Sequence, residues 1–387
     1  MNQFILTREL GLDSPQVFRT FHLMKQVYSI ELSHKVELNK EHFGTVNCLS
    51  IESIEGRYLL SGGADCAIHV YDLETPSDID GKIKIDSISN VPRNSGHEYA
   101  ISGINWYPFD TGLFTTSSFD KTIRVWDTNS MKEVCDFELN GKVYSHDMSP
   151  VGNHCLISAA ASEPFIRLCD LRSGAFTHSL TGHKGSVITT RWSPRDEYLL
   201  ASGGADHTIR LWDIRKARAC LMSLDQHNAG KEALSTTNVA HSGMVNGLTF
   251  TQDGMYLLST GHDEKMRLWN MTTSENTLTN YGPLIRNKSR SCVSPMIVPS
   301  DTCWPPVVYH PSDDHRIFMF DLFEGHLIKE MTGHYGRVTC TSWRPCHEEF
   351  YSGGSDYEIL AWSPFTSEAV EKKLSKEVDT WSDDDTE

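Results

Sequence analysis

Residues 183–213 read HKGSVITTRWSPRDEYLLASGGADHTIRLWD, and this stretch decides the fold. It opens on His183 and carries Ser202, Asp206 and Trp212 at distances that recur in four other parts of the chain. In each part an aspartate follows the histidine by 22 or 23 residues, a hydroxyl residue precedes the aspartate by four, and an aromatic residue follows it by six. The five sets are His42, Ser61, Asp65 and Tyr71; His97, Thr116, Asp120 and Trp126; His183, Ser202, Asp206 and Trp212; His241, Ser259, Asp263 and Trp269; His334, Ser352, Asp356 and Trp362. Such spacing indicates an internal repeat.

Each repeat is predicted to be a small antiparallel sheet. Short apolar runs such as YLLSGG (58–63) alternate with runs of period two such as TIRVWD (122–127), and tight turns separate them. Two weaker repeats run from VYSHDMSP (143–150) to FIRLCDLRSG (165–174) and from SCVSPMIVP (291–299) to HRIFMFDLFEG (315–325). Cys169 and Phe320 take their ring positions, so neither weak repeat has the full set. The total is therefore seven units.

The seven units together span residues 41–363, about 48 residues apart on average. The two longest intervals contain the insertions SDIDGKIKIDSISN (77–90) and QHNAGKEALSTTNVA (226–240). A ring of sheets has to close, because open strand edges invite aggregation. The last unit lacks an outer strand, since the chain reaches Pro364 soon after Trp362. We expect VYSIELS (27–33), which alternates with period two, to supply that strand and to join the two ends of the ring.

This repeat resembles the WD repeat, and the resemblance implies an all-β, seven-bladed WD-repeat β-propeller over residues 27–363. In that family the four repeated residues form a hydrogen-bonded tetrad across each blade. A Ser, His and Asp together could also form a catalytic triad. However, a catalytic site is needed once, whereas a structural tetrad is needed in every blade. The chain also has no G-x-S-x-G, phosphate-loop or H-E-x-x-H motif. The Gly pairs at 62–63, 203–204 and 353–354 are expected to serve turns. We therefore expect no catalytic, cofactor or metal site.

The composition of the chain disfavours several classes of function. The chain has 35 basic and 51 acidic residues, a formal net charge of −16, which disfavours direct nucleic-acid binding because such binding depends on Lys and Arg. No run of 18 apolar residues predicts a membrane span, and no secretion signal opens the chain. The ten cysteines include no CxxC pair, so we expect free buried thiols in a reducing compartment.

Three features of the sequence are not required to form a propeller. Residues 1–26 are predicted to form two amphipathic helices divided at Gly11–Pro15, which dock either on the propeller or in a groove of a partner. Two consecutive repeats end in D-x-R, with Arg172 two residues after Asp170 and Arg215 two residues after Asp213. Residues 364–387 are expected to be an acidic, disordered tail in which Ser382, followed by three aspartates, resembles an acidophilic kinase site.

Over nearly its whole length the chain resembles the family of Cockayne syndrome group A WD-repeat proteins. The matching segments are GLDSP (11–15), EGRYLLSGGAD (55–65), WYPFDTGLFTTSSFDKTIRVWDTN (106–129), VYSHDMSP, the two D-x-R motifs, LDQHN (224–228), NGLTFTQDG (246–254), MRLWN (266–270), ENTLTNYG (275–282), GHYGRV (333–338), YSGGSD (351–356) and the acidic tail. No close match is apparent at 76–96 or 286–306. The resemblance implies a non-catalytic, nuclear substrate receptor of a cullin-four RING ubiquitin ligase in transcription-coupled nucleotide excision repair, associated with chromatin after DNA damage.

The same resemblance implies two binding surfaces. The N-terminal helices would insert into the triple-propeller damaged-DNA-binding adaptor of the ligase, and the D-x-R face would rest on it. The residues expected at the adaptor are Arg8, Leu12, Pro15, Phe18, Arg19, Asp170, Arg172, Asp213 and Arg215. The opposite face would take the Cockayne syndrome group B translocase and the stalled RNA polymerase II complex. The residues expected there are Tyr99, Phe119, Lys184, His262, Tyr335 and Arg337. The alternatives are a WD-repeat scaffold of another complex, in RNA processing or signalling, and an enzyme.

Overall fold

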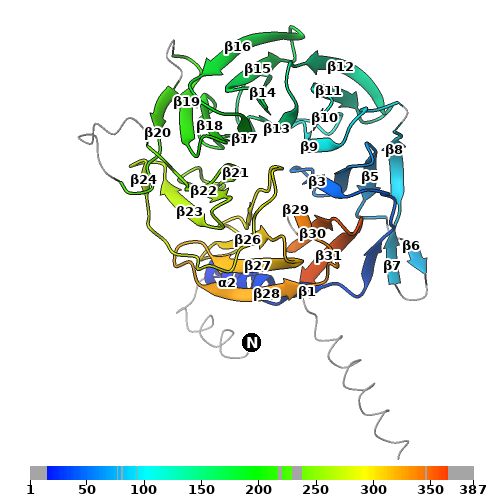
Figure 1. Ribbon diagram of the computed structural model, residues 1–387. Helices are drawn as coiled ribbons and strands as arrows, with labels where there is room; N and C mark the ends of the chain where they lie inside the picture. Colours follow the sequence, from blue (N-terminus) through cyan, green and yellow to red (C-terminus); the bar gives the residue numbers. More distant parts are fainter. Residues whose placement is uncertain are drawn as a thin grey trace, which may run out of the picture.

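The computed structural model describes residues 15–75, 77–79, 82–93, 95–216, 220–228, 238–344 and 347–364. Seven four-stranded antiparallel sheets are arranged around a central axis, and the first strands of neighbouring sheets pack side by side (Figure 1). β29 (Val338–Arg344) of the last blade lies beside β3 (Val46–Ile51) of the first, which closes the ring. The predicted seven-bladed propeller is therefore confirmed.

Blades one to four each contain four strands. Blade one has β3, β4 (Tyr58–Gly63), β5 (Ile68–Asp72) and β8 (Ser87–Val91); blade two has β9 (Ile101–Trp106), β10 (Leu113–Ser118), β11 (Thr122–Asp127) and β12 (Lys132–Glu138). Blade three has β13 (Val143–Met148), β14 (Leu156–Ala161), β15 (Phe165–Asp170) and β16 (Ala175–Thr181); blade four has β17 (Val187–Trp192), β18 (Leu199–Gly204), β19 (Ile209–Asp213) and β20 (Cys220–Ser223).

Blades five to seven follow the same order. Blade five has β21 (Val245–Phe250), β22 (Tyr256–Gly261), β23 (Met266–Asn270) and β24 (Glu275–Asn276); blade six has β25 (Met296–Ile297), β26 (Val307–Pro311), β27 (Arg316–Asp321) and β28 (Leu327–Thr332). Blade seven has β29, β30 (Glu349–Gly354), β31 (Ile359–Pro364) and β1 (Ile30–Leu32).

The N-terminal strand completes the last blade, because β1 pairs antiparallel with β31 from Ile30↔Pro364 to Leu32↔Trp362. The strand begins at Ile30 and not at Val27. Residues 27 and 28 instead end the helix α2 (Pro15–Tyr28). The reason is that Met24, Val27 and Tyr28 share one helical side, and all three pack against the core between blades six and seven.

The 77–90 insertion contains the outer strand of blade one, β8, which pairs with β5. The rest of it forms β6 (Ser77–Ile79) and β7 (Lys82–Ile85), and β7 runs parallel to β2 (Val36–Leu38) in a separate three-stranded sheet. The alternating sequence KIKI (82–85) is typical of a strand. The repeat spacing alone, however, indicated that the whole segment was inserted outside the blade. The first predicted N-terminal helix, most of the 226–240 insertion and the acidic tail lie outside the described residues.

Apolar side chains of neighbouring blades form the core. Trp212 and Leu200 of blade four, for example, pack with Leu168 and Ile166 of blade three, and all four are inaccessible to solvent. The nine described cysteines are free, as expected; four of them are buried and five are partly exposed, so the expectation of buried thiols holds for only some of them. Within the described part of the chain, no helix has the length and apolar character needed to cross a membrane.

Candidate functional site: the two faces of the propeller

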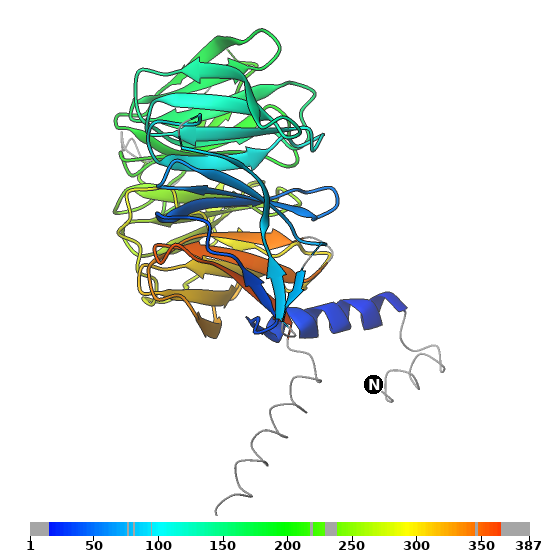
Figure 2. The same cartoon turned by 90° about the vertical axis from the view of Figure 1, so that its right-hand side faces the viewer.

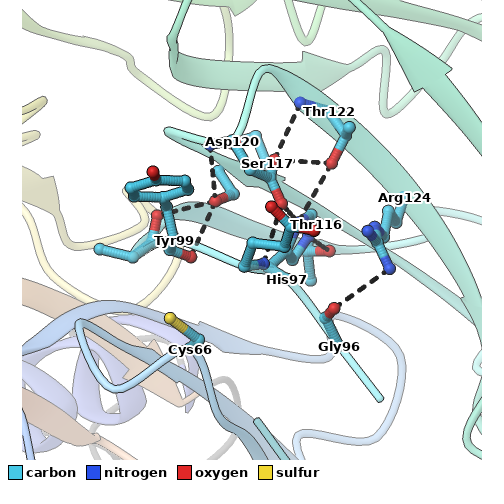
Figure 3. A network of polar contacts seen from close by, with 12 residues as sticks. Cys66, Gly96, His97, Tyr99, Thr116, Ser117, Asp120, Thr122 and Arg124 are labelled. Carbon is cyan, nitrogen blue, oxygen red and sulfur yellow. Dashed lines mark hydrogen bonds and ion pairs between the residues drawn. The ribbon is translucent and has the colours of Figure 1, made fainter. Parts of the chain in front are cut away.

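A polar tetrad lies inside each of the four blades that carry the tryptophan. The indole N–H donates to the serine or threonine hydroxyl at 2.7–2.9 Å, and the Nε2 atom of the histidine lies 2.7–2.8 Å from the same hydroxyl. The histidine Nδ1 atom lies 2.7–3.0 Å from the aspartate. Figure 3 shows part of this arrangement in blade two, the contacts of His97 with Thr116 and Asp120. Each tetrad therefore joins a loop, two strands and a turn.

The tetrad aspartate also fixes the loop that follows the histidine. In blade four the backbone N–H of Lys184 donates to Asp206 at 2.9 Å. Burial by itself would raise the pKa of Asp206, but the hydrogen bond to His183 and the backbone donor hold that pKa well below its ordinary value. In blade seven the same balance lowers the pKa of Asp356 to about 2. We call the side of the ring that carries these loops and turns the tetrad face.

The second glycine of each Gly pair leaves room for the tetrad. Gly204 lies within strand β18, and a Cβ atom there would come within 2.8 Å of both His183 Nδ1 and Asp206 Oδ1. Its backbone does not adopt the left-handed conformation. The expectation that these pairs serve turns holds in part: the Gly63 and Gly354 carbonyls accept the turn hydrogen bonds of Cys66 and Tyr357 at 3.2 and 3.3 Å, but close packing against the imidazole is what requires the second glycine.

Blade one departs from this pattern. His42 contacts Ser61 at 2.7 Å and Asp65 at 3.0 Å, as in the other blades. Among the described residues, however, no hydrogen-bond partner exists for the buried Tyr71 hydroxyl or for either ring nitrogen of His69, the buried neighbour of His42. Burial lowers the pKa of His69 to about 4. Tyr71 therefore fills the ring position without donating to the tetrad.

The two weaker repeats lack a tetrad because other residue types occupy the tetrad positions. In blade three, Cys169 and Ala159 stand at the ring and hydroxyl positions, both fully buried. In blade six, Phe320 and His310 stand there, and burial lowers the pKa of His310 to about 4. Cys169, Ala159 and Phe320 have no side-chain nitrogen or oxygen that could complete a tetrad.

The tetrad histidines have no geometry for catalysis, because none of the five is more than 7% exposed to solvent. A triad needs a nucleophile that substrate can reach. In the described part of the chain, no group of three or more His, Cys, Asp or Glu side chains is placed to hold a metal ion.

Arg172 and Arg215 lie on the opposite side of the ring from the tetrad turns, because each follows the end of a third strand, β15 or β19. The guanidinium of Arg215 donates to Asp213 at 3.0 and 3.1 Å and stacks 4.4 Å from the centre of the Tyr198 ring. Arg215 nevertheless keeps 56% of its side chain exposed. Arg172 is exposed, and its backbone N–H donates to Asp170. We call this side the D-x-R face.

Helix α2 emerges on the D-x-R face. It leads into β1 at Ile30, which pairs with Pro364 at the end of β31, the third strand of blade seven. Figure 2 shows α2 projecting away from the ring on one side. The helix packs on blades six and seven, whereas Arg172 and Arg215 follow the third strands of blades three and four. Of the residues expected at the adaptor, Arg19 is exposed on α2, Pro15 begins α2, Phe18 lies within it, and Arg8 and Leu12 precede the described residues.

A groove of about 680 Å³ lies beside Arg215 on the D-x-R face. Val151, Tyr198 and Met271 contribute to its walls together with Arg195. No pattern in the sequence predicts this groove, because its lining residues come from three different blades.

All six residues expected on the tetrad face lie in its loops and turns. Tyr99, Lys184 and Tyr335 are exposed. Phe119 and His262 are half-buried, since Phe119 packs edge-on against Tyr144 and His262 Nε2 lies 2.5 Å from the Ser289 carbonyl oxygen. Arg337 pairs with Asp313 at 3.7 Å. The sequence prediction missed Phe43, which is 90% exposed and follows His42 just as Tyr335 follows His334.

Comparison with known proteins adds to this geometry. The model of the WD domain, G-beta repeat, matches residues 33–72, 90–127, 174–213, 232–270 and 325–363, about half of the chain. The WD repeat-containing protein ATCSA-1 of Arabidopsis thaliana is 33% identical over 99% of this chain and its own full length. The radiation-sensitive protein 28 of Saccharomyces cerevisiae is 28% identical over 45% of this chain and 38% of its own length. The ribosome biogenesis protein WDR12 homolog of Anopheles gambiae is 27% identical over 60% of this chain and 53% of its own. The chain belongs to the WD40-repeat family.

Proposed function

We propose that this protein is a non-catalytic substrate receptor of a cullin-four RING ubiquitin ligase that acts in transcription-coupled nucleotide excision repair. The observation that carries the proposal is the match to ATCSA-1, which extends over both chains from end to end. The name of the yeast relative refers to radiation sensitivity, which is consistent with a role in repair.

The arrangement of the D-x-R face supports docking on the ligase adaptor. Helix α2 and the two arginines lie on the same side of the ring but on different blades, α2 at blades six and seven and the arginines at blades three and four. A partner that contacts both must therefore span several blades of this face. Because Asp213 and Tyr198 hold the Arg215 guanidinium, little side-chain entropy is lost when it binds a carboxylate of the partner.

The tetrad face would remain open to substrates. Stalled RNA polymerase II and its associated translocase are the proposed clients, and the nucleus is the proposed location. The receptor would act by proximity, because binding both client and ligase raises the effective concentration of client lysines near the ubiquitin-charged enzyme. Such a role needs no catalytic residue on this chain.

Pull-down with the triple-propeller adaptor tests the proposal. We expect wild-type protein to bind, deletion of residues 1–26 to abolish binding, and Arg172→Ala/Arg215→Ala to weaken it. The matched control is Arg286→Ala/Arg316→Ala, which removes two arginines of similar exposure (57% and 48%) from the tetrad side of blades five and six. Undiminished binding by the first two variants, or equal loss in the control, would rule out the docking model. The melting temperature of each variant excludes misfolding.

A second candidate is a scaffold of ribosome biogenesis, since several WDR12 homologs match this chain. These matches cover only part of it, for example 50% in Aedes aegypti. Co-purification with pre-ribosomal particles and not with the adaptor would favour this candidate.

A further inference from the structure

A tryptophan stands exposed on the D-x-R face, next to the part of blade six on which α2 packs. Trp304 lies in the connection between β25 and β26 and is 59% exposed. This connection lies at the opposite end of blade six from the β26–β27 turn, and therefore on the D-x-R face. The preceding residue, Cys303, is buried in the same apolar core as Val27 of α2. The exposed indole is thus continuous with the docking helix.

A second aromatic residue occupies the D-x-R position of blade six. Phe323 lies two residues after Asp321, the same distance that separates each arginine of the D-x-R motif from its aspartate. The backbone N–H of Phe323 donates to Asp321 at 2.8 Å, and the backbone N–H groups of Arg172 and Arg215 donate to their aspartates at 3.1 Å. The three turns are therefore held in the same way. The residues at this position in blades one, two and five are Glu74, Asn129 and Thr272. Among these described turns, only that of blade six presents an aromatic ring.

Phe323 is fixed between two other rings. Its ring centre lies 5.8 Å from that of Trp304 and 5.2 Å from that of Tyr256 of blade five. Phe323 and Tyr256 also pack against the core between blades five and six. The Phe323 carbonyl accepts a hydrogen bond from the Thr279 hydroxyl at 3.2 Å. We call Trp304, Phe323 and Tyr256 the aromatic anchor. Because these rings are already packed together, a partner would bind them with little loss of conformational entropy.

The aromatic anchor lies between the two parts of the proposed docking surface. Helix α2 packs on blades six and seven, and Arg215 follows the third strand of blade four. The first strands of blades four, five and six, β17, β21 and β25, pack against one another in this order. Blade five, which contributes Tyr256, therefore separates blade six from blade four. A partner that reaches from α2 to Arg215 by this route covers the anchor.

We infer that the aromatic anchor binds an aliphatic or aromatic side chain of the ligase adaptor. Burial of Trp304 in such a contact removes its exposed apolar surface from water, and tryptophan is one of the residues that dominate the binding energy of interfaces. Arg215 offers a cation to a carboxylate of the partner, whereas Phe323 offers an uncharged ring at the equivalent position. The complementary group therefore changes from a carboxylate to an apolar side chain. This inference rests on the proposed ligase function, to which it adds one contact and its chemistry.

Titration of the full-length protein with the purified triple-propeller adaptor, followed by biolayer interferometry, tests the inference. Trp304→Ser should raise the Kd at least about ten-fold, because it removes a large side chain from the interface. Trp304→Phe, which keeps an aromatic ring, should raise it much less. The matched control is Tyr99→Ser, which removes an aromatic residue of similar exposure (61%) from the tetrad face and should leave the Kd unchanged.

A second variant tests the chemistry of the contact. Phe323→Arg extends the D-x-R motif to blade six and should weaken binding, because it places a cation against an apolar side chain of the adaptor. A carboxylate of the adaptor at this point would instead make binding tighter. The melting temperature of each variant is measured in parallel. If Trp304→Ser melts below wild type, Trp304→Lys, which keeps a long side chain at this surface position, repeats the test.

The outcomes separate the inference from the ligase proposal. Equal binding by Trp304→Ser and wild-type protein, equal loss in the Tyr99→Ser control, or tighter binding by Phe323→Arg would overturn the inference while the ligase proposal stands. If wild-type protein does not bind the adaptor, both fail.

Discussion

A single buried hydroxyl group connects each complete tetrad at the residue scale. Ser202 Oγ lies 2.7 Å from both His183 Nε2 and Trp212 Nε1. Removing this oxygen leaves two buried polar groups without a partner, which costs more than the net contribution of one hydrogen bond. In blade one, by contrast, the Tyr71 hydroxyl makes no hydrogen bond with any described residue.

This difference gives a paired prediction. Ser202→Ala should lower the free energy of unfolding by about 1–3 kcal/mol, whereas Tyr71→Phe should leave it unchanged or raise it slightly. Urea titration of both variants measures the two effects. Equal destabilisation by the two substitutions would contradict the distinction between blade one and blade four.

Buried His310 predicts a dependence of stability on pH. Burial lowers the pKa of His310 to about 4 from an ordinary value of 6.5, and it outweighs the opposing effects of the Pro311 backbone and of Asp314. The unfolded chain therefore takes up a proton first, so the stabilisation is complete above pH 6.5 and is lost as the pH falls towards 4. At pH 5 the loss should be about 2 kcal/mol from this group. Urea titrations at pH 7 and 5 should show a smaller difference for His310→Leu than for wild type. The exposed His178→Leu serves as the control and should retain the wild-type difference.

At the scale of elements, the short strand β1 closes the ring. Its residue Glu31 pairs with Ser363, and the next hydrogen bond runs from the Ser33 N–H to the Ala361 carbonyl at 2.9 Å. Glu31 thus turns its backbone N–H towards β31, where a proline cannot replace it.

Glu31→Pro should therefore lower the melting temperature clearly, because it removes a ladder bond at the closure of the propeller. Glu31→Gln keeps the backbone and loses only the exposed ion pair with Lys329, worth about 0–1 kcal/mol, so its melting temperature should stay close to wild type. Differential scanning calorimetry makes the comparison. If the proline variant melts like the glutamine variant, β1 does not hold the ring closed.

The repeat pattern predicted the blades because each tetrad requires fixed residue types at fixed distances. The boundaries of the helices and strands depend on tertiary packing, which the repeat pattern does not encode. Val27 fits a strand of period two and a helical stripe equally well, and only contact with the core of blades six and seven places it on α2. The outer strand of blade one escaped prediction because the additional β6–β7 strands separate it from β5.

At the scale of the whole molecule, the propeller presents two chemically different faces. The D-x-R face carries α2, Arg215 and a groove, and the tetrad face carries the exposed side chains of Phe43, Tyr99 and Tyr335. The sequence predicted that Arg172 and Arg215 lie on the same face, because the D-x-R motif recurs in consecutive blades. It could not single out Phe43 from other apolar residues, since the exposure of a loop side chain depends on how the neighbouring blades are arranged.

Hydrogen-exchange mass spectrometry of the complex with the triple-propeller adaptor tests the central claim most directly. The account predicts that the adaptor slows amide exchange in α2 and around Arg172 and Arg215, while the tetrad-face loops at 42–44, 97–99 and 334–336 keep the exchange rates of the free protein. Protection of the tetrad-face loops in place of the D-x-R face, or the failure of the two proteins to form a complex, would contradict it.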